Sequence, residues 1–173
     1  MELYVLRHAI AVSHGAIQYP NDDRPLTEEG IALMKEAARG IARVVDAPDI
    51  VLTSPMKRAH QTATIAAKAM GCQDRVKTST KLLPGFKNAD LIAELAGIRR
   101  KERVMIVGHE PDLGRFASSL LGGTAPFIEF KKGALCRIDL DTLSAEGRAG
   151  RLVWHLAPSH LRAIGKKEKK KKS

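Results

Sequence analysis

The sequence predicts an α/β sandwich with a largely parallel central sheet. Apolar runs of strand length alternate along the chain with segments of helical periodicity, which is the order of elements in α/β proteins. The early runs are apolar throughout, as expected of strands that helices cover on both faces. A length of 173 residues suits one domain with a substantial core.

The first half of the chain is predicted to contain two strands and two helices. The expected elements are a strand at residues 3–6, a turn-rich loop at 11–26, a helix at 27–45 and a strand at 49–54. Thr27 is expected to cap the first helix. Ser54 and Pro55 are expected to begin the second helix, as its cap and its first residue. Alanines at helical spacing give that helix a small-residue face that can lie close to a sheet.

The second half begins with the same alternation and then becomes rich in strands. The expected elements are a minor strand at residues 76–79, helices at 89–98 and 111–121, a strand at 103–109, and strand-like segments at 126–130, 134–140 and 151–157. Turns are expected around residues 132–133 and 147–150. The helix after residue 110 has a core-facing stripe at i, i+3, i+4, i+7 and i+8 spacing.

The basic character of the chain is concentrated at its C-terminus. The net charge is +10, and residues 166–173 contribute +5 through six lysines and one glutamate. Such a run repels itself and buries nothing, so we expect a disordered tail at 166–173 on a domain of residues 1–165. The remaining charge suits an anionic ligand. An aromatic content of 4% does not favour stacking on nucleic-acid bases.

Other features of the composition predict a cytoplasmic protein without a bound metal. No apolar run approaches the length of a membrane span, and we expect no secretory or transit signal. Cys72 and Cys136 are expected to be buried thiols in a reducing compartment. His14 and His60 are expected at the surface. Because no three residues have metal-ligand spacing, we expect neither a metal nor another cofactor.

Polar side chains follow three of the apolar strands directly. Arg7 and His8 come after the first strand, Ser54 ends the second and His109 follows the strand that begins at residue 103. Arg58 lies near the start of the helix that Ser54 precedes. Because the carboxyl ends of parallel strands meet at one edge of the sheet, we expect these side chains to converge.

This set of side chains is typical of a phosphoryl-binding site. Guanidinium groups donate paired hydrogen bonds to phosphoryl oxygens and neutralise charge in the transition state. One histidine can attack phosphorus if its reactive nitrogen is unprotonated, which requires a partner on the other nitrogen. The second histidine can stay cationic beside the phosphoryl group and stabilise its charge.

Four segments resemble the histidine phosphatase superfamily, which contains cofactor-dependent phosphoglycerate mutase: "LRHA" at the N-terminus, "RPLTEEG" at 24–30, "TSPMKRAHQTA" at 53–63 and "VGHEP" at 107–111. Together with the short length, they look most like SixA-type phosphohistidine phosphatases. The resemblance implies a three-layer α/β/α sandwich of the phosphoglycerate mutase type that needs no metal. It also implies that His8 is the nucleophile, that Arg7 and Arg58 bind the phosphoryl group, and that His109 is the second histidine of the phosphate pocket.

The chain departs from the family pattern at two places. Ala9 follows the nucleophile where the family usually has glycine, and a methyl group there could crowd the phosphate or oppose a positive φ. Many mutase-like members also carry an acidic glutamate after the third strand, but this chain has no carboxylate there before Asp90. Glu110, beside His109, is the candidate proton donor, with a plain helix-start carboxylate as the alternative.

The segment at residues 80–102 is too short for the helical lid of mutase-like relatives, which favours a bulky substrate. Phosphohistidine on a phosphotransfer protein or histidine kinase domain fits, because its imidazole leaves without strong need of an acid. One alternative is a phosphomonoesterase acting on phosphoserine or a small phosphate ester. An alternative of another class is a basic, non-catalytic binding protein. Neither a membrane nor a nucleic-acid partner is expected.

Overall fold

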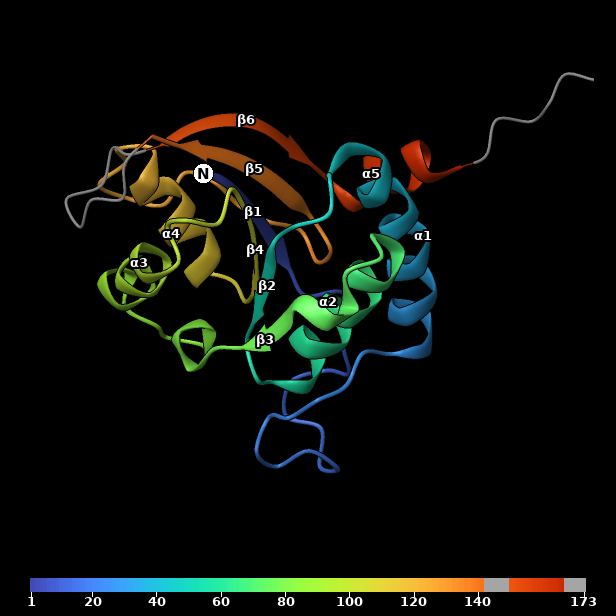
Figure 1. The fold of residues 1–173 in the computed structure, drawn as a ribbon. Helices are drawn as coiled ribbons and strands as arrows, with labels where there is room; N and C mark the ends of the chain where they lie inside the picture. Colours follow the sequence, from blue (N-terminus) through green and yellow to red (C-terminus); the bar gives the residue numbers. More distant parts are fainter. Residues whose placement is uncertain (142–149, 167–173) are drawn as a thin grey trace, which may run out of the picture.

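The computed structural model, which describes residues 1–141 and 150–166, has a six-stranded sheet at its centre (Figure 1). The strands are β1 (Glu2–Arg7), β2 (Ile50–Thr53), β3 (Val76–Thr78), β4 (Arg103–Gly108), β5 (Leu135–Leu140) and β6 (Gly150–Leu156). Their spatial order is β3-β2-β4-β1-β5-β6. The strands from β3 to β1 run parallel. At one side, β5 pairs antiparallel with β1, and β6 pairs antiparallel with β5. The predicted, mostly parallel sheet is therefore confirmed.

Helices cover both faces of the sheet and complete a three-layer sandwich (Figure 1). One apolar cluster joins the sheet to α1 (Glu28–Val44), α2 (Lys57–Ala69) and α5 (Pro158–Gly165). A second cluster joins the other face to α3 (Asn88–Gly97) and α4 (Asp112–Leu120), and it includes Leu82 from the short 3-10 turn η2 (Thr80–Leu82). Another 3-10 turn, η1 (Gln73–Arg75), leads into β3.

The strand β1 belongs to both apolar clusters. Leu3 and Val5 pack into the cluster of α3 and α4, whereas Tyr4 and Leu6 pack into the cluster of α1, α2 and α5. This alternation follows from the two-residue period of a strand, and it explains why all four residues are apolar. Burial on both faces also fixes the strand in place, so the position of its last residue is well determined.

The register of the sheet brings the ends of three strands to the same level. Arg7 at the end of β1 pairs with Gly108 at the end of β4. At the end of β2, the backbone N–H of Ser54 donates to the carbonyl oxygen of Val107 at 2.9 Å. The residues that follow these strands therefore start from one edge of the sheet, as the sequence predicts.

Helix α1 begins as expected, and α5 is an element that the sequence interpretation missed. The hydroxyl of Thr27 accepts a hydrogen bond from the N–H of Gly30 at 2.9 Å, which confirms Thr27 as the cap. Helix α5 packs against α1 at Gly40, where an added Cβ would lie 1.9 Å from the carbonyl oxygen of Leu161. Only a glycine permits so close an approach of the two helices.

Two expected elements are wrong in this structure. Residues 126–130 form no strand, because their backbone donors bond to side chains instead of to a neighbouring strand: the N–H groups of Phe127 and Ile128 bond to Ser118 Oγ, and that of Phe130 bonds to Glu110 Oε1. Helix α2 begins at Lys57 rather than Pro55, with Met56 as its cap residue. Ser54 lies in the turn between β2 and α2 instead of capping the helix.

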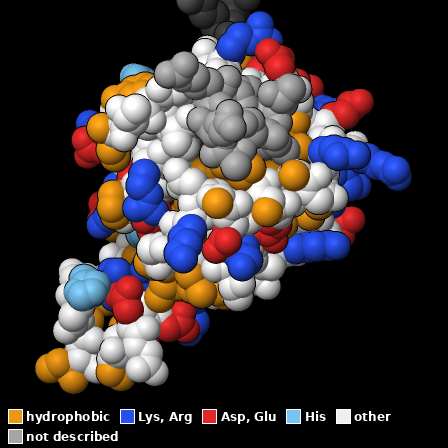
Figure 2. All heavy atoms as spheres, turned by 90° about the vertical axis from the view of Figure 1, so that its left-hand side faces the viewer, with side chains coloured by type: hydrophobic (Ala, Val, Ile, Leu, Met, Phe, Trp, Pro, Cys, Tyr) orange, Lys and Arg blue, Asp and Glu red, His pale blue; other side chains and the backbone are white. Residues whose placement is uncertain are grey.

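Some expectations lie outside the described residues. The turn expected at 147–150 falls there except for its last residue, and so does the tail at 166–173 apart from Lys166. Within the described part of the chain, no helix is long and apolar enough to cross a membrane. On the face shown in Figure 2, Lys and Arg side chains are interspersed with acidic and hydrophobic ones and do not form one continuous patch.

Candidate active site

His8 lies immediately beyond β1, and its backbone N–H donates to the carbonyl oxygen of Gly108 at 3.0 Å. Its imidazole Nδ1 lies 2.8 Å from the carbonyl oxygen of Ala9. Because a carbonyl oxygen only accepts, Nδ1 carries the hydrogen, and Nε2 keeps its lone pair in the neutral ring. Burial, together with the positive charges of Arg58 and Arg7, lowers the pKa of His8 from 6.5 to about 4. The ring is therefore neutral at pH 7 with Nε2 available as a nucleophile.

Arg7 is the last residue of β1, and the segment before β5 holds its side chain. One terminal nitrogen donates to the carbonyl oxygen of Phe130 at 2.5 Å. The backbone carbonyl of Arg7 accepts a hydrogen bond from the N–H of Gly133 at 3.2 Å. Burial lowers the pKa of Arg7 below its ordinary value, although the guanidinium remains a cation at neutral pH. Its charge acts on His8, which places the two groups in one site.

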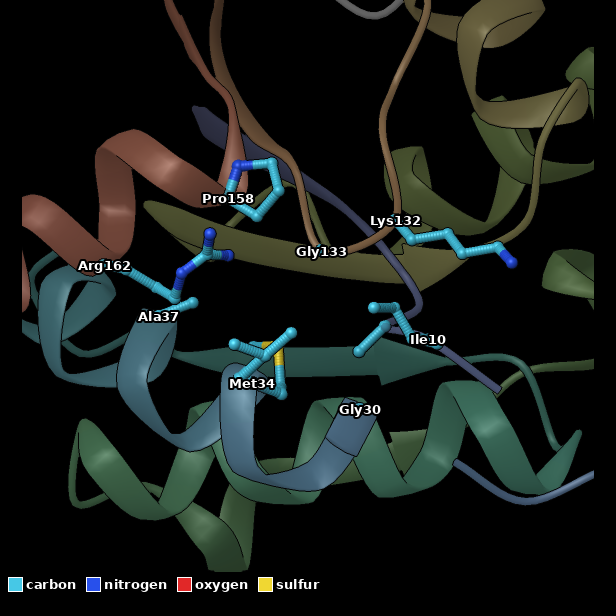
Figure 3. A pocket seen from close by; sticks show the side chains of 10 residues that line it. Ile10, Gly30, Met34, Ala37, Lys132, Gly133, Pro158 and Arg162 are labelled. Carbon is cyan, nitrogen blue, oxygen red and sulfur yellow. The ribbon is translucent and has the colours of Figure 1, made fainter. Parts of the chain in front are cut away.

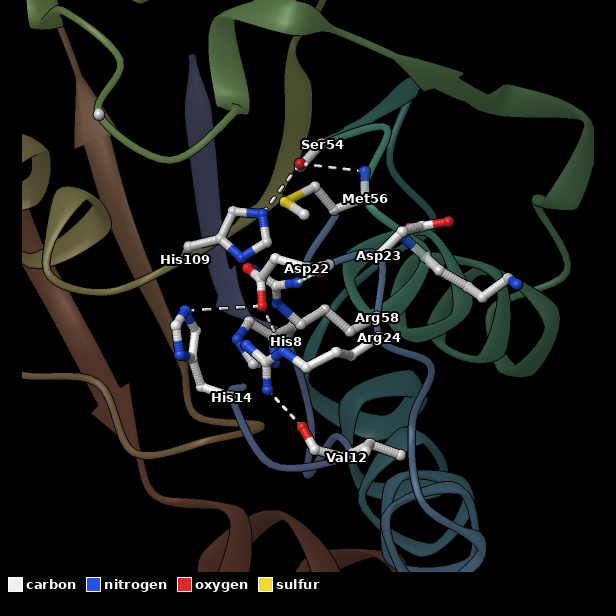
Figure 4. Close-up of polar contacts among 12 residues, drawn as sticks. His8, Val12, His14, Asp22, Asp23, Arg24, Ser54, Met56, Arg58 and His109 are labelled. Carbon is white, nitrogen blue, oxygen red and sulfur yellow. Dashed lines mark hydrogen bonds and ion pairs between the residues drawn. The ribbon is translucent and has the colours of Figure 1, made fainter. Parts of the chain in front are cut away.

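Arg58 lies in the first turn of α2, and its side chain is only 4% exposed. Its two terminal nitrogens donate to one residue of the loop before α1, Asp22: one to the backbone oxygen at 2.8 Å, the other to carboxylate Oδ2 at 3.1 Å. The same carboxylate also accepts from Arg24 Nε. Figure 4 shows Arg58, Arg24 and Asp22 grouped beside the rings of His8 and His109.

His109 follows β4, and its ring faces that of His8 with a centroid separation of 5.2 Å (Figure 4). Its Nε2 lies 2.9 Å from Ser54 Oγ, which in turn accepts a hydrogen bond from the N–H of Met56 at 3.3 Å. When the Ser54 hydroxyl donates to Nε2, the hydrogen of the neutral ring is on Nδ1, where it can be donated to an anion. Burial lowers the pKa of His109 from 6.5 to about 3, with Arg58 adding to the effect. A phosphoryl dianion beside the ring would raise that pKa again.

Most of the buried side-chain polar atoms without a partner in the described residues belong to this site. They are Arg7 Nε, Arg58 Nε and His109 Nδ1, and the one such atom elsewhere is Asn88 Oδ1. An unpaired buried polar group costs about 1–3 kcal/mol, so groups of this kind need an explanation. Three nitrogens on three neighbouring side chains are explained by a ligand rich in acceptor oxygens.

Glu110 is next to His109 in the chain, but backbone groups hold its carboxylate. Oε1 accepts from the N–H of Phe130 at 2.9 Å, and Oε2 accepts from the N–H of Gly114 at 3.3 Å. Burial raises the pKa of Glu110, although these two bonds and the charge of Arg7 oppose the increase. Since the carbonyl of Phe130 also binds Arg7, Glu110 supports the segment that positions this arginine. Its role as proton donor stays a prediction.

Ala9 has no positive φ: among the described residues, the non-glycine residue with a positive φ is Asp22. The N–H of Ala9 donates to Thr62 Oγ1 at 3.0 Å, and the residue is buried in the apolar cluster of α1, α2 and α5. It also lines a cavity of about 60 Å³ between α1 and the turn at residues 132–133 (Figure 3). The backbone conformation therefore accepts alanine where the family usually has glycine.

The structure places in the site several residues that the sequence did not assign to it. Asp22 and Arg24 lie in a polar loop with no periodic pattern, and only the "RPLTEEG" motif pointed to this region. Thr62 was expected only as part of the second helix, although its hydroxyl accepts a hydrogen bond from Ala9, the residue after His8. Lys132 adds positive charge near His8. His14 is exposed as expected, and its Nε2 also lies 3.9 Å from Asp22.

The described residues contain no group of three or more histidine, cysteine, aspartate or glutamate side chains arranged to hold a metal ion. Cys72 and Cys136 are buried free thiols.

Comparison with known proteins assigns the chain to a family. The model of the histidine phosphatase superfamily (branch 1) matches residues 3–90. An uncharacterised protein of Picosynechococcus sp. (strain PCC 7002) is 36% identical over an alignment of 143 residues, and the match covers 78% of this chain and 82% of that protein. The chain belongs to the histidine phosphatase superfamily.

Solved structures show the same fold and place the chain beside SixA-type members. The protein histidine phosphatase SixA, solved in complex with tungstate, superposes with a TM-score of 0.79 at 25% identity, over 93% of this chain and 99% of that one. A phosphoserine phosphatase from Entamoeba histolytica, solved with 3-phosphoglyceric acid, has a TM-score of 0.64 at 16% identity, over 92% of this chain and 98% of that one. At the latter identity the likeness shows the fold alone. Together with the family, the match to SixA supports a phosphatase of the SixA type.

Proposed function

We propose that this phosphatase removes the phosphoryl group from phosphohistidine on a phosphotransfer protein or histidine kinase domain in the cytoplasm. The observation that carries the proposal is the state of His8: its Nδ1 is bonded to the carbonyl oxygen of Ala9, so Nε2 is the free nitrogen of a neutral ring. Arg7, Arg58 and His109 then serve as the groups that bind the phosphoryl oxygens, which explains their unpaired nitrogens.

The reaction has two steps. In the first, the lone pair of His8 Nε2 attacks phosphorus, and the bond from phosphorus to the substrate nitrogen breaks, so that the leaving imidazole keeps the electron pair. In the second, water attacks the phosphohistidine, the P–N bond breaks and orthophosphate is released, with the water proton passing to solvent or a nearby base. The two arginines and His109 stabilise the charge of the phosphoryl oxygens in both transition states.

Two observations favour a phosphohistidine substrate. The first step exchanges one P–N bond for another and makes little demand on an acid, which suits a site whose nearest glutamate, Glu110, is bonded to backbone N–H groups. The connection between β3 and β4 also packs into the core through Leu82, Leu91 and Leu95. In Figure 1 its helix α3 lies beside α4, on the sheet face opposite to α2. An enzyme without a lid from this segment can accept a phosphorylated protein.

The proposal is tested by comparing substrates with and without a P–N bond. Wild-type protein, His8→Ala and the control His60→Ala, which changes an exposed histidine on α2, are assayed on a phosphohistidine-bearing phosphotransfer domain and on a phosphoserine peptide. We expect kcat/KM at least about tenfold higher on the phosphohistidine, no turnover by His8→Ala and full activity of His60→Ala. Faster hydrolysis of the phosphoserine peptide would favour the phosphomonoesterase. The absence of turnover on both would favour a binding protein.

A further inference from the structure

The loop between β1 and α1 brings a carboxylate to one of the phosphate-binding arginines. Asp22 contacts Arg58 through both its backbone oxygen and its carboxylate, and the same carboxylate binds Arg24 Nε and lies 3.9 Å from His14 Nε2. Asp22 has a φ of +57°, a conformation that L residues rarely adopt but that Asp and Asn tolerate. Figure 4 shows its carboxylate beside the two histidine rings.

The ion pair of Asp22 with Arg58 has a clear electrostatic origin. The Arg58 side chain is 4% exposed, and a buried cation is costly without an anion nearby. Burial raises the pKa of Asp22, but the hydrogen bond from Arg24 and the charges of Arg58 and Arg24 lower it to below its ordinary value. The carboxylate is therefore ionised at neutral pH and neutralises Arg58.

A bound phosphoryl group changes this balance. It carries a charge of about −1.5 to −2 at pH 7, and it would lie beside the same guanidinium. Two anions would then share Arg58 and repel each other. Asp22 has another cationic partner in Arg24, and its side chain is 32% exposed, so it can give up its contact with Arg58 while it stays paired.

We propose that Asp22 competes with phosphate for Arg58, and that its carboxylate weakens the binding of orthophosphate and so promotes product release. The inference rests on the proposed function, because it takes Arg58 as a phosphate ligand. Asp22 would then set the affinity of the pocket for orthophosphate, the product. Without the carboxylate, two arginines and a histidine would retain orthophosphate longer after each turnover.

Asp22→Asn separates this role from a merely structural one. The amide oxygen can still accept a hydrogen bond from Arg58, the backbone oxygen of residue 22 is unchanged, and asparagine tolerates the same φ. The substitution therefore removes the charge and keeps the geometry. Asp23→Asn is the matched control, because it removes the same charge one residue away. Oδ1 of Asp23 accepts from the N–H of Lys57 at 2.8 Å, and its charge acts on Arg58 more weakly than that of Asp22.

The experiment is a calorimetric titration of each purified protein with orthophosphate, with competition against p-nitrophenyl phosphate hydrolysis as a second readout. On the Coulomb scale of partly exposed sites, the loss of one negative charge beside the ligand should tighten binding by roughly tenfold in Asp22→Asn. Asp23→Asn should bind within about twofold of the wild type, and added salt should reduce the gain of Asp22→Asn.

The possible outcomes separate the two proposals. Unchanged or weaker orthophosphate binding by Asp22→Asn, with the wild type binding normally, overturns the inference and leaves the proposed function in place. Equal tightening by Asp22→Asn and Asp23→Asn also overturns it, because a general charge effect would then suffice. Arg58→Ala reports on the proposed function: if its orthophosphate binding equals that of the wild type, Arg58 is no phosphate ligand and both proposals fail. Should Asp22→Asn melt far below the wild type, Asp22→Gly, which also lacks the charge and accepts the positive φ without strain, replaces it.

Discussion

Thr62 Oγ1 accepts a hydrogen bond from the backbone N–H of Ala9 at 3.0 Å and donates its own hydrogen to the carbonyl oxygen of Arg58 at 2.7 Å. One hydroxyl on α2 therefore connects the residue after His8 with the helical turn that carries Arg58. All three residues are buried. One side chain of the second helix therefore helps to fix the position of the nucleophile relative to this arginine.

Thr62→Val should weaken both the fold and the site, because it leaves the buried N–H of Ala9 without an acceptor. We expect the free energy of unfolding in urea to fall by about 1–3 kcal/mol and kcat to decrease as well. Thr64→Val is the control. The Thr64 hydroxyl donates to the carbonyl of His60, as that of Thr62 does to Arg58, but it lies on an exposed part of the helix. Equal losses in the two variants would show that the bond to Ala9 contributes nothing of its own.

Ser54→Ala should reduce catalysis with little effect on stability. The substitution removes the hydroxyl that contacts His109 Nε2 and leaves the ring free to place its hydrogen on either nitrogen. We expect kcat/KM for p-nitrophenyl phosphate to fall by roughly tenfold, in line with one hydrogen bond of about 1–1.5 kcal/mol. Ser54→Thr, which keeps a hydroxyl, should recover part of the activity. An alanine variant with wild-type kinetics would remove Ser54 from the site.

Glu110→Gln distinguishes support from proton donation. Backbone N–H groups bond to both carboxylate oxygens. We therefore expect the variant to lower kcat/KM for p-nitrophenyl phosphate and for phenyl phosphate by the same factor. Phenolate is the poorer leaving group and depends more on a proton donor. A larger loss on phenyl phosphate than on p-nitrophenyl phosphate, measured as the ratio of the two kcat/KM values, would identify Glu110 as the proton donor.

His8 should make stability depend on pH in a defined window. Its pKa is about 4 in the folded protein, because of burial, against an ordinary value of 6.5. Between these values the unfolded chain takes up a proton that the folded protein does not, so stability is complete above pH 6.5 and falls as the pH falls toward 4.

Urea unfolding at pH 7 and pH 5 measures this effect. Wild-type protein should lose roughly 2 kcal/mol more than His8→Asn over that interval. His60→Asn, changed at an exposed histidine, should behave like the wild type. Parallel losses in the wild type and His8→Asn would mean that the His8 ring is already protonated, or is not buried, in the folded protein.

Much of the fold, and the convergence of the candidate site residues at one edge of the sheet, could be predicted from the sequence because both depend on local patterns. The apolar run before Arg7 and His8 predicted a buried strand, and Thr27 predicted the start of α1, as the structure confirms. The convergence of strand ends followed from the parallel sheet. The phosphate-binding roles themselves stay predictions.

The errors arose where tertiary contacts decide the conformation. Residues 126–130 look like a strand because of their apolar and aromatic residues, but Ser118 and Glu110 take up their backbone donors. Ser54 and Pro55 look like a helix start, yet α2 begins at Lys57 and Ser54 contacts His109. The contact of Asp22 with Arg58 joins a loop and a helix 36 residues apart, and no sequence periodicity indicates it.

The most direct test of the account is the detection of a phosphoryl group on His8 during turnover. Protein mixed with p-nitrophenyl phosphate is quenched with alkali, in which phosphohistidine survives, and its peptides are sequenced by mass spectrometry. The account predicts one phosphoryl group on the peptide that contains His8, located on that residue, and none in His8→Ala. Turnover without any phosphorylated His8, or a phosphoryl group on His109 instead, would contradict it.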